Sequence, residues 1–169
     1  MIRIYPDPIL RRRARPVRPG SAEAEETVRR LTEAFSQVEA LGLAANQVGA
    51  LARVIVVRLG EDEQTYVVLN PQVVSRSAEL TEDSEGCLSL PGVEADVPRP
   101  QEVVVRGQSP TGKPLELAAA GVDARVVQHE IDHLDGVLYV DHLPVDRRRA
   151  VLRAFRRRQA ALAATPANA

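Results

Sequence analysis

The chain has 169 residues, enough to bury a real core, and we predict a single domain over residues 1–169. Its 22 basic and 23 acidic residues nearly cancel to a formal net charge of −1, which gives no support for binding to DNA or to a membrane surface. The only cysteine, Cys87, excludes an intramolecular disulfide. Because we also find no signal-peptide pattern and no apolar run of membrane-spanning length, we expect a cytoplasmic protein.

The N-terminal part is predicted to be an extended arm followed by a helix. Residues 2–5 alternate in polarity, and residues 6–19 are rich in proline and arginine. Ser21 is a suitable N-cap for a helix over residues 23–40, which has the apolar stripe Val28, Leu31, Phe35 and Val38. Gly42 is expected to end this helix and to open a Gly/Ala-rich segment over 42–49.

Strand patterns dominate the middle of the chain. We predict strands over 53–59, 65–70, 73–79 and 102–106, a weaker one over 115–118, a loop over 85–92 and a tight turn at 111–113. A second helix is expected from Gly121 or Asp123 to about Gly136, and a third over 145–163, with a frayed tail over 164–169. This order predicts an α+β fold with mainly antiparallel sheets packed around the central second helix.

The second helix contains the pentapeptide His129-Glu130-Ile131-Asp132-His133. Positions four apart lie on one helical face, so both imidazoles can bind one divalent cation, and Glu130 can take a proton from a metal-bound water. The alternative is a solvated helix that happens to carry two histidines. The helix is apolar on two sides, however, which predicts that it is mostly buried. Its buried polar groups would then need partners.

A catalytic tetrahedral site normally needs a third protein ligand. The position that holds a third histidine in metzincin proteases is Tyr139, which leaves His142 and Cys87 as candidates. We favour Cys87 because a thiolate binds borderline cations well and its glycine-flanked loop can approach a helix closely. A lone cysteine is, however, more often an inert buried residue.

Three segments together resemble the signature motifs of the peptide deformylase family, in the family's order. They are Gly42-Leu43-Ala44-Ala45-Asn46-Gln47, Glu85-Gly86-Cys87-Leu88-Ser89 and Gln128-His129-Glu130-Ile131-Asp132-His133-Leu134, and the similarity extends over residues 7–143. The resemblance implies hydrolytic removal of the N-formyl group from nascent peptides that begin with formyl-methionine. It also implies one metal ion bound by Cys87, His129 and His133, namely Fe²⁺ in the cell, replaceable by Ni²⁺, Co²⁺ or Zn²⁺.

The resemblance further implies roles for the residues around this ion. Glu130 would accept the proton of the attacking water and pass it to the leaving amine, while the Gln47 amide and the Leu88 backbone N–H would stabilise the oxyanion. Without the resemblance, Gln47 could equally cap a loop. Apart from the resemblance, we expect Glu85, paired with Arg99, to hold the loop or a ligand and Asp132 to serve as another supporting acid, although both carboxylates also suit ordinary salt bridges.

Substrate binding is expected to be partly through the main chain. The resemblance places the peptide backbone at Leu41, Gly42 and Gly86, and the spacing of Val122 and Val126 before the ligands suggests a lining for the methionine pocket or plain core packing. Two residues depart from the family pattern: Ala40, where glycine is usual, and Glu94, where some members have a basic residue.

The third helix carries many arginines, which predicts a solvated face or, given the nascent substrate, contact with ribosomal RNA. Two rival functions share part of this pattern. One is a metalloendopeptidase with the same pentapeptide, which lacks its usual third histidine or glutamate here. The other is a closed structural metal site formed by Cys87, His129, His133 and His142, in which Glu130 would have no chemical purpose.

Overall fold

The computed structural model describes residues 1–164. After the short 3-10 helix η1 (Pro8–Arg11), α1 spans Ala22–Ser36, and its predicted N-cap is confirmed because the Ser21 side chain accepts a hydrogen bond from the Ala24 backbone N–H at 3.3 Å. The helix ends before the predicted residue 40. The Gly/Ala-rich segment that follows forms the short strand β1 (Gly42–Ala44) and the 3-10 helix η2 (Ala45–Val48).

A five-stranded antiparallel sheet has the order β1-β2-β3-β6-β7, which makes β1 an edge strand. Strands β2 (Val54–Leu59), β6 (Glu102–Gln108) and β7 (Pro114–Ala120) confirm three predicted strands. The prediction of separate strands over 65–70 and 73–79 is wrong, because one strand, β3 (Gln64–Arg76), runs through the first range and into the second, where it ends at Arg76. Its register shifts between Leu69 and Gln72, where Asn70 has a positive φ of 53° and its side chain bonds the backbone of Val17.

A second, two-stranded antiparallel sheet was not predicted. It consists of β4 (Leu80–Gly86) and β5 (Glu94–Pro100). The predicted loop over 85–92 is therefore wrong at its start, since Glu85 and Gly86 belong to β4 and only the residues after them turn back. A paired strand, and not a free loop, therefore holds Glu85 beside the central helix.

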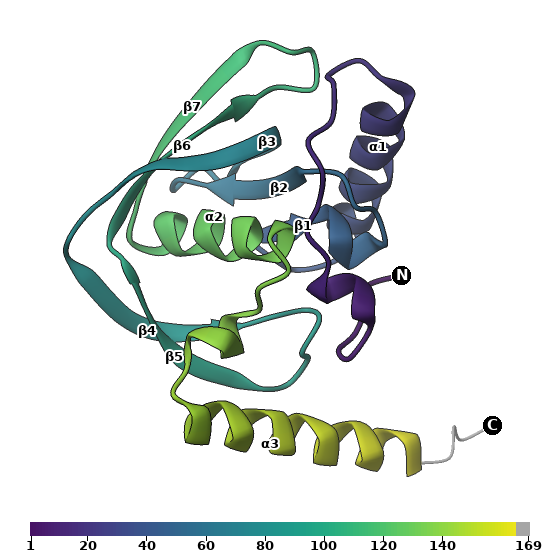
Figure 1. Cartoon of the computed structure of the whole chain (residues 1–169), viewed down its shortest axis with the longest axis vertical. Coiled ribbons are helices and arrows are strands. Elements are labelled where there is room, and N and C mark those ends of the chain that lie inside the picture. Colours follow the sequence, from purple (N-terminus) through teal and green to yellow (C-terminus); the bar gives the residue numbers. More distant parts are fainter. Residues whose placement is uncertain (165–169) are drawn as a thin grey trace.

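Helix α2 (Gly121–Leu134) lies in the middle of the molecule, between the five-stranded sheet and the β4–β5 hairpin (Figure 1). Its buried residues Ala124, Val127, Ile131 and Leu134 join the core formed by the sheet and α1. The predicted α+β class with antiparallel sheets around a central helix is confirmed. The one-domain organisation stays a prediction.

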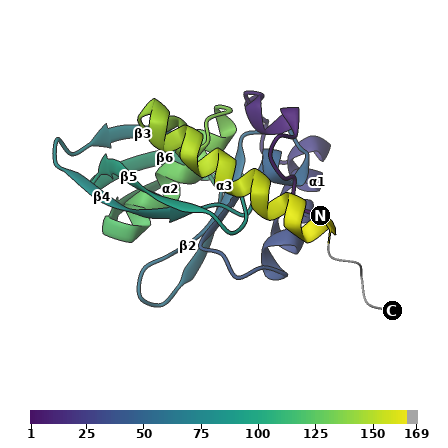
Figure 2. The same cartoon turned by 90° about the horizontal axis from the view of Figure 1, so that it is seen from below.

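Helix α3 (Val145–Ala164) follows the 3-10 helix η3 (Tyr139–His142) and lies outside the β4–β5 hairpin, which it crosses in the view from below (Figure 2). Phe155 anchors it in a second apolar cluster with Leu90, Val97 and Tyr139. The predicted frayed tail lies outside the described residues apart from Ala164, the last residue of α3. Within residues 1–164, no helix is long and apolar enough to cross a membrane.

Candidate metal centre and active site

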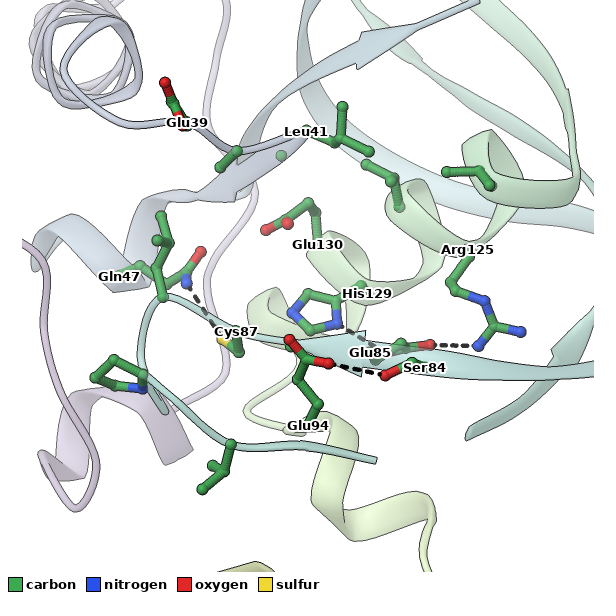
Figure 3. A pocket seen from close by; sticks show the side chains of 18 of the residues that line it. Glu39, Leu41, Gln47, Ser84, Glu85, Cys87, Glu94, Arg125, His129 and Glu130 are labelled. Atoms are coloured by element: carbon green, nitrogen blue, oxygen red, sulfur yellow. Dashed lines mark hydrogen bonds and ion pairs between the residues drawn. The ribbon is translucent and has the colours of Figure 1, made fainter. Parts of the chain in front are cut away.

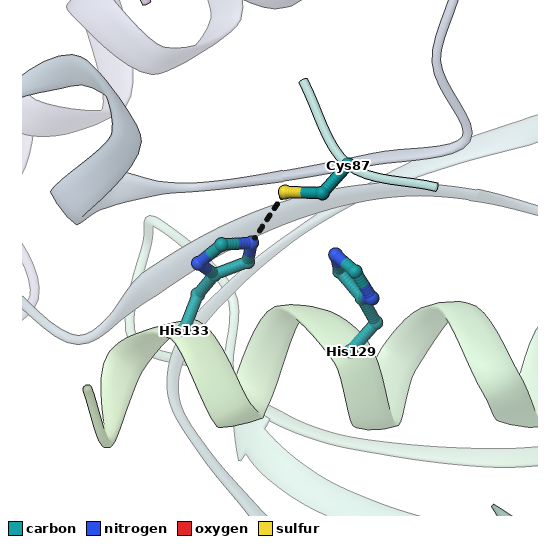
Figure 4. Close-up of side chains that lie close together, drawn as sticks. All are labelled: Cys87, His129 and His133. Carbon is teal, nitrogen blue, oxygen red and sulfur yellow. Dashed lines mark hydrogen bonds between the residues drawn. The ribbon is translucent and has the colours of Figure 1, made fainter. Parts of the chain in front are cut away.

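Three side chains from two distant segments converge beside α2. His129 and His133 project from one face of the helix, and Cys87 comes from the turn after β4 (Figure 4). Their possible ligand atoms all lie within 4.8 Å of one another, and Cys87 Sγ lies 3.2 Å from His133 Nε2. One thiolate and two imidazoles suit Fe²⁺, Co²⁺, Ni²⁺ or Zn²⁺, so this donor set fits a single divalent ion.

The His129 ring is held by a buried carboxylate. His129 Nδ1 lies 2.9 Å from Glu85 Oε2, which leaves Nε2 as the ring nitrogen available to a metal. Glu85 in turn receives two hydrogen bonds from Arg99, at 2.6 and 2.9 Å, and one from Arg125 at 2.8 Å. Burial opposes ionisation of Glu85, but the hydrogen bonds from Arg99 and His129 prevail and hold its pKa well below the usual value.

Arg125 is a residue of the site that sequence reasoning missed. Its guanidinium is mostly buried, and it also donates to the carbonyls of Val97 and Thr81, so it ties helix α2 to both strands of the β4–β5 hairpin. Within the sequence it looks like any other helical arginine between apolar neighbours. No local signal marks it, because its partners come from strands that were not predicted as such.

His142 is engaged elsewhere. Its Nε2 lies 2.7 Å from Asp132 Oδ2, and the same carboxylate oxygen accepts a hydrogen bond of 2.6 Å from Arg99. Among the described residues, the group of candidate ligands contains Cys87, His129 and His133, and His142 is not part of it. A closed four-ligand structural site is therefore not favoured.

The electrostatic setting favours the thiolate form of Cys87. Burial acts to raise the pKa of the thiol, but the neighbouring His133 and His129 rings outweigh it and lower that pKa well below the usual value. Burial correspondingly acts to lower the pKa of His129, while Cys87 and Glu85 raise it well above its ordinary value. The pocket thus already stabilises the anionic sulfur that a metal ion requires.

Glu130 is the second unusual carboxylate. It is 5% exposed, and its Oε2 is a buried oxygen without a hydrogen-bond partner among residues 1–164. Burial raises its pKa to about 7, against the opposing effect of His129 and His133. A buried oxygen with no protein partner beside three candidate ligands fits a site whose remaining components are a cation and its water.

Gly42 gives this carboxylate its space. A Cβ built on Gly42 would lie 2.6 Å from Glu130 Oε1 and 2.7 Å from its Cγ, so no larger residue fits without displacing Glu130. Leu41 O accepts a hydrogen bond from Arg58 N on β2 at 2.8 Å. Because successive residues of an antiparallel strand face opposite sides, the N–H and C=O of Gly42 face away from β2, toward the open edge.

Gln47 approaches the centre from η2. It is 2% exposed, and its Oε1 accepts a hydrogen bond from the Ala44 backbone N–H at 2.9 Å, which fixes the orientation of the amide. Its Nε2 lies 3.6 Å from Cys87 Sγ and 3.2 Å from Ser89 Oγ. The neighbouring Asn46 donates to the His133 carbonyl oxygen. The 42–47 segment therefore contacts both the cysteine turn and the end of the histidine helix.

A cavity of about 520 Å³ opens onto this centre (Figure 3). Predicted site residues that line it are Leu41, Gly42, Gln47, Glu85, Gly86, Cys87, Leu88, Val122, Val126, His129 and Glu130. Arg99, Asp132 and His133 lie behind this wall and do not line it. The lining also includes Glu39 and Ser84, which sequence reasoning did not single out, and Glu94, which it noted only as a departure.

A cavity lined by Cys87, His129 and the buried Glu130 carboxylate, with His133 completing the candidate ligand group behind its wall, defines a metal-dependent hydrolase of the His-Glu-x-x-His kind. Comparison with known proteins identifies the family. Residues 1–149 match the sequence model of the family described as Polypeptide deformylase, and the chain belongs to this family.

Individual relatives are similar to this protein in sequence and in structure over most of the chain. The peptide deformylase of Natranaerobius thermophilus is 41% identical over 140 residues, which cover 83% of this chain and 89% of the relative. A crystal structure of a peptide deformylase from Legionella pneumophila superposes with a TM-score of 0.89 at 33% identity, covering 98% of each chain. The Ehrlichia chaffeensis enzyme in complex with actinonin matches with a TM-score of 0.86 at 30% identity, over 93% of this chain and 95% of that one.

Proposed function

We infer that this protein is a hydrolase that removes the N-formyl group from the N-terminal formyl-methionine of newly synthesised proteins and releases formate. The observation that carries the inference is the meeting of Cys87 with His129 and His133 next to the partnerless carboxylate of Glu130, in a chain of the deformylase family. An endopeptidase function is not favoured, since the third candidate ligand is a cysteine. The reaction would take place in the cytoplasm.

We propose that Cys87, His129 and His133 hold one divalent ion, Fe²⁺ in the cell, with Ni²⁺, Co²⁺ or Zn²⁺ able to replace it. When bound, such an ion supplies Lewis acidity, which makes a water more acidic and draws charge from a carbonyl oxygen. By bonding Nδ1 of His129, Glu85 leaves Nε2 of this ring available to hold the ion. Arg99 and Asp132 support this arrangement from behind, at 2.6 Å from each other.

Side-chain and backbone groups of the protein would transfer the proton and stabilise the negative charge that develops on the formyl oxygen. With its pKa raised to about 7, Glu130 suits a base that takes a proton from water near neutral pH and later gives it to the leaving amine. The Nε2 amide of Gln47 donates without titrating, and it stabilises negative charge on the formyl oxygen together with the Leu88 backbone N–H. The fixed Oε1–Ala44 bond keeps this donor in place.

The cavity would also bind the peptide main chain and the methionine side chain of the substrate. Gly42, whose backbone faces outward, and Leu41 and Gly86, which line the same cavity, would bind the peptide main chain. Val122 and Val126 line the pocket for the methionine side chain. Val122 is 63% exposed, so a bound apolar side chain would cover surface that now faces the opening.

Helix α3 concerns the source of the substrate, because nascent chains emerge from the ribosome. Exposed arginines on it include Arg149, Arg153, Arg156 and Arg157. We propose contact with ribosomal RNA through this face, because guanidinium groups bind phosphates well. Replacing Arg153, Arg156 and Arg157 with glutamine should weaken co-sedimentation with ribosomes at low salt. Unchanged binding would rule this contact out.

The function is tested by measuring formate release from formyl-Met-Ala-Ser by protein purified anaerobically with iron. The wild-type protein should deformylate this peptide and leave an internal-peptide reporter intact. Glu130→Gln should keep its metal content and lose roughly 10²–10⁴-fold in kcat. Cleavage of the internal reporter without formate release would refute the assignment.

A further inference from the structure

The N-terminal end of the chain is hydrogen-bonded to both segments that carry the proposed oxyanion donors. The Arg3 backbone N–H donates to the Gln47 carbonyl oxygen at 2.7 Å, and the Tyr5 backbone N–H donates to the Ser89 carbonyl oxygen at 2.9 Å. Gln47 supplies the side-chain donor, and the residue before Ser89 supplies the backbone donor. We call residues 3–5 the N-terminal strap. None of them lines the active-site cavity, so the strap can act on the reaction only through the residues that it holds.

The strap connects two segments whose backbones are not otherwise bonded to each other. Among residues 1–164, no backbone hydrogen bond joins residues 42–49 directly to residues 86–92. The Gln47 side chain does reach across, with Nε2 at 3.6 Å from Cys87 Sγ and 3.2 Å from Ser89 Oγ. This amide is, however, the group that a substrate oxygen would engage. The strap holds the two segments together without occupying it.

Side chains fix the strap at both of its ends. At one end, a Cβ built on Gly49 would lie 3.1 Å from both Nε and Nη2 of Arg3, so the guanidinium lies against the end of η2. At the other end, the Tyr5 ring meets the Phe155 ring of α3 edge-on, with the ring centroids 6.0 Å apart. Tyr5 also packs against the apolar cluster that contains Leu90 of the cysteine turn. The strap is therefore anchored beside each donor segment.

Only alternate N–H groups of the strap face the two donor segments. Ile4 lies between the two bonded residues and is 37% exposed. Its N–H makes no hydrogen bond within the described part of the chain. Neighbouring residues of an extended segment point to opposite sides, which accounts for this alternation. Loss of the N–H at position 3 or at position 4 is therefore the same chemical change, but only the first removes a bond to the active site.

We propose that the N-terminal strap positions the oxyanion donors: it holds the Gln47 segment relative to the Leu88 N–H, so that both donors reach the same formyl oxygen. This inference rests on the proposed function, since it concerns the reaction of the same site. Removal of one oxyanion donor costs about 10²–10³-fold in kcat, and a misplacement of about 1 Å can cost about 10²-fold. Loss of one strap bond shifts a donor without removing it, so a roughly tenfold loss in kcat is expected.

The test compares Arg3→Pro with Ile4→Pro in iron-loaded protein, by formate release from formyl-Met-Ala-Ser. Proline has no backbone N–H, so Arg3→Pro removes the bond to the Gln47 carbonyl, whereas Ile4→Pro removes an unbonded N–H. Arg3→Pro should lose roughly tenfold in kcat with KM changed by less than about twofold, because the oxyanion forms only in the transition state. Ile4→Pro should keep kcat within about twofold of the wild type. Arg3→Ala keeps the N–H and should lose less than Arg3→Pro.

Two measurements separate positioning from a general loss of structure. The metal content of Arg3→Pro should equal that of the wild type, because the strap contacts no candidate ligand by a hydrogen bond. In the background of Gln47→Ala, Arg3→Pro should cost less than about threefold in kcat, because the donor that it displaces is already absent. If Arg3→Pro does not fold, deletion of residues 2–4 removes the same N–H and should cause the same loss in kcat.

The outcomes distinguish the strap from the function on which it rests. Equal kcat in Arg3→Pro and Ile4→Pro would overturn the strap. So would a tenfold loss that persists undiminished in the background of Gln47→Ala, or wild-type kcat after deletion of residues 2–4. Absence of formate release from the wild-type protein would instead contradict the proposed function.

Discussion

The contact between Gly42 and Glu130 allows a sharp prediction for Gly42→Ala. The new Cβ would lie 2.6 Å from Glu130 Oε1, whereas ordinary contact begins at 3.4 Å, so the carboxylate must move by roughly 0.8 Å. The backbone itself tolerates alanine, because Gly42 is not among the glycines with positive φ. A misplacement of about 1 Å at a reacting group costs on the order of 10²-fold in rate, so we expect kcat/KM to fall about 30- to 100-fold.

The assay is formate release from formyl-Met-Ala-Ser, with metal content and thermal unfolding measured on the same samples. Because the clash is with Glu130 and not with a ligand, the metal content should equal that of the wild type. The overpacking should lower the free energy of unfolding by about 1–3 kcal/mol. Activity should therefore be lost from protein that is folded and loaded.

The background of Glu130→Gln supplies the control. If Gly42→Ala acts by displacing the Glu130 carboxylate, adding it to Glu130→Gln should reduce the residual activity by less than about threefold. A wild-type kcat in Gly42→Ala with normal metal content would refute the reasoning. So would a further 30-fold loss in the double variant, since the glycine would then act through some other group.

Three further outcomes follow from contacts in the structure. Arg125→Leu removes a hydrogen bond to Glu85 and should weaken metal affinity by roughly 10- to 100-fold in chelator competition, while Arg125→Lys should lose less; equal affinity in both variants would contradict this role. Removing the metal with a chelator should abolish formate release and lower the unfolding temperature, and adding Zn²⁺ or Co²⁺ should restore both. Asp141→Asn removes ion pairs to Arg11 and Arg148 and should lower the free energy of unfolding by roughly 1 kcal/mol at pH 7, after allowance for solvent screening. Burial acts to raise the pKa of Asp141, but the hydrogen bonds from Arg11 and Leu138 outweigh it and hold that pKa below the usual range of an aspartate. This stabilisation is therefore full at neutral pH and is lost as pH falls through the lowered pKa, so urea unfolding of the two proteins should converge in acid.

Sequence reasoning predicted the elements whose patterns are local. The Ser21 cap, the periodic apolar residues of α2 and the valine-rich β2 each carry their own signal, and each formed as expected. It failed for β4 and β5. Strand β4 reads Leu-Thr-Glu-Asp-Ser-Glu-Gly, and β5 contains Pro98 and Pro100, so neither has strand propensity of its own.

Those two strands form because they pair with each other and are tied to α2 by side chains. Arg125 joins the carbonyls of Thr81 and Val97, one on each strand. Such a bridge depends on residues more than 25 positions apart, which no local window contains. Tertiary contacts override weak propensity here.

For the site, too, local patterns could be predicted from the sequence, and contacts between distant residues could not. The spacing of His129 and His133 indicated a metal-binding helix face from first principles, but Cys87 and His142 remained rivals on that argument alone. The chemistry of a thiolate in a glycine-flanked loop favoured Cys87, the resemblance strengthened that preference, and the structure brings Cys87 to the histidines while Asp132 engages His142. The acidic residues Glu39 and Glu94 carry no motif. Their relation to the cavity emerges only once β1 and the β4–β5 hairpin face each other across it.

The account depends on Cys87, His129 and His133 sharing one ion. X-ray absorption of the zinc-loaded protein tests this most directly. One sulfur at about 2.3 Å and two imidazole nitrogens at about 2.0–2.1 Å are expected, with the sulfur signal lost in Cys87→Ser. A spectrum without sulfur, or one with a third imidazole that disappears in His142→Ala, would contradict the account.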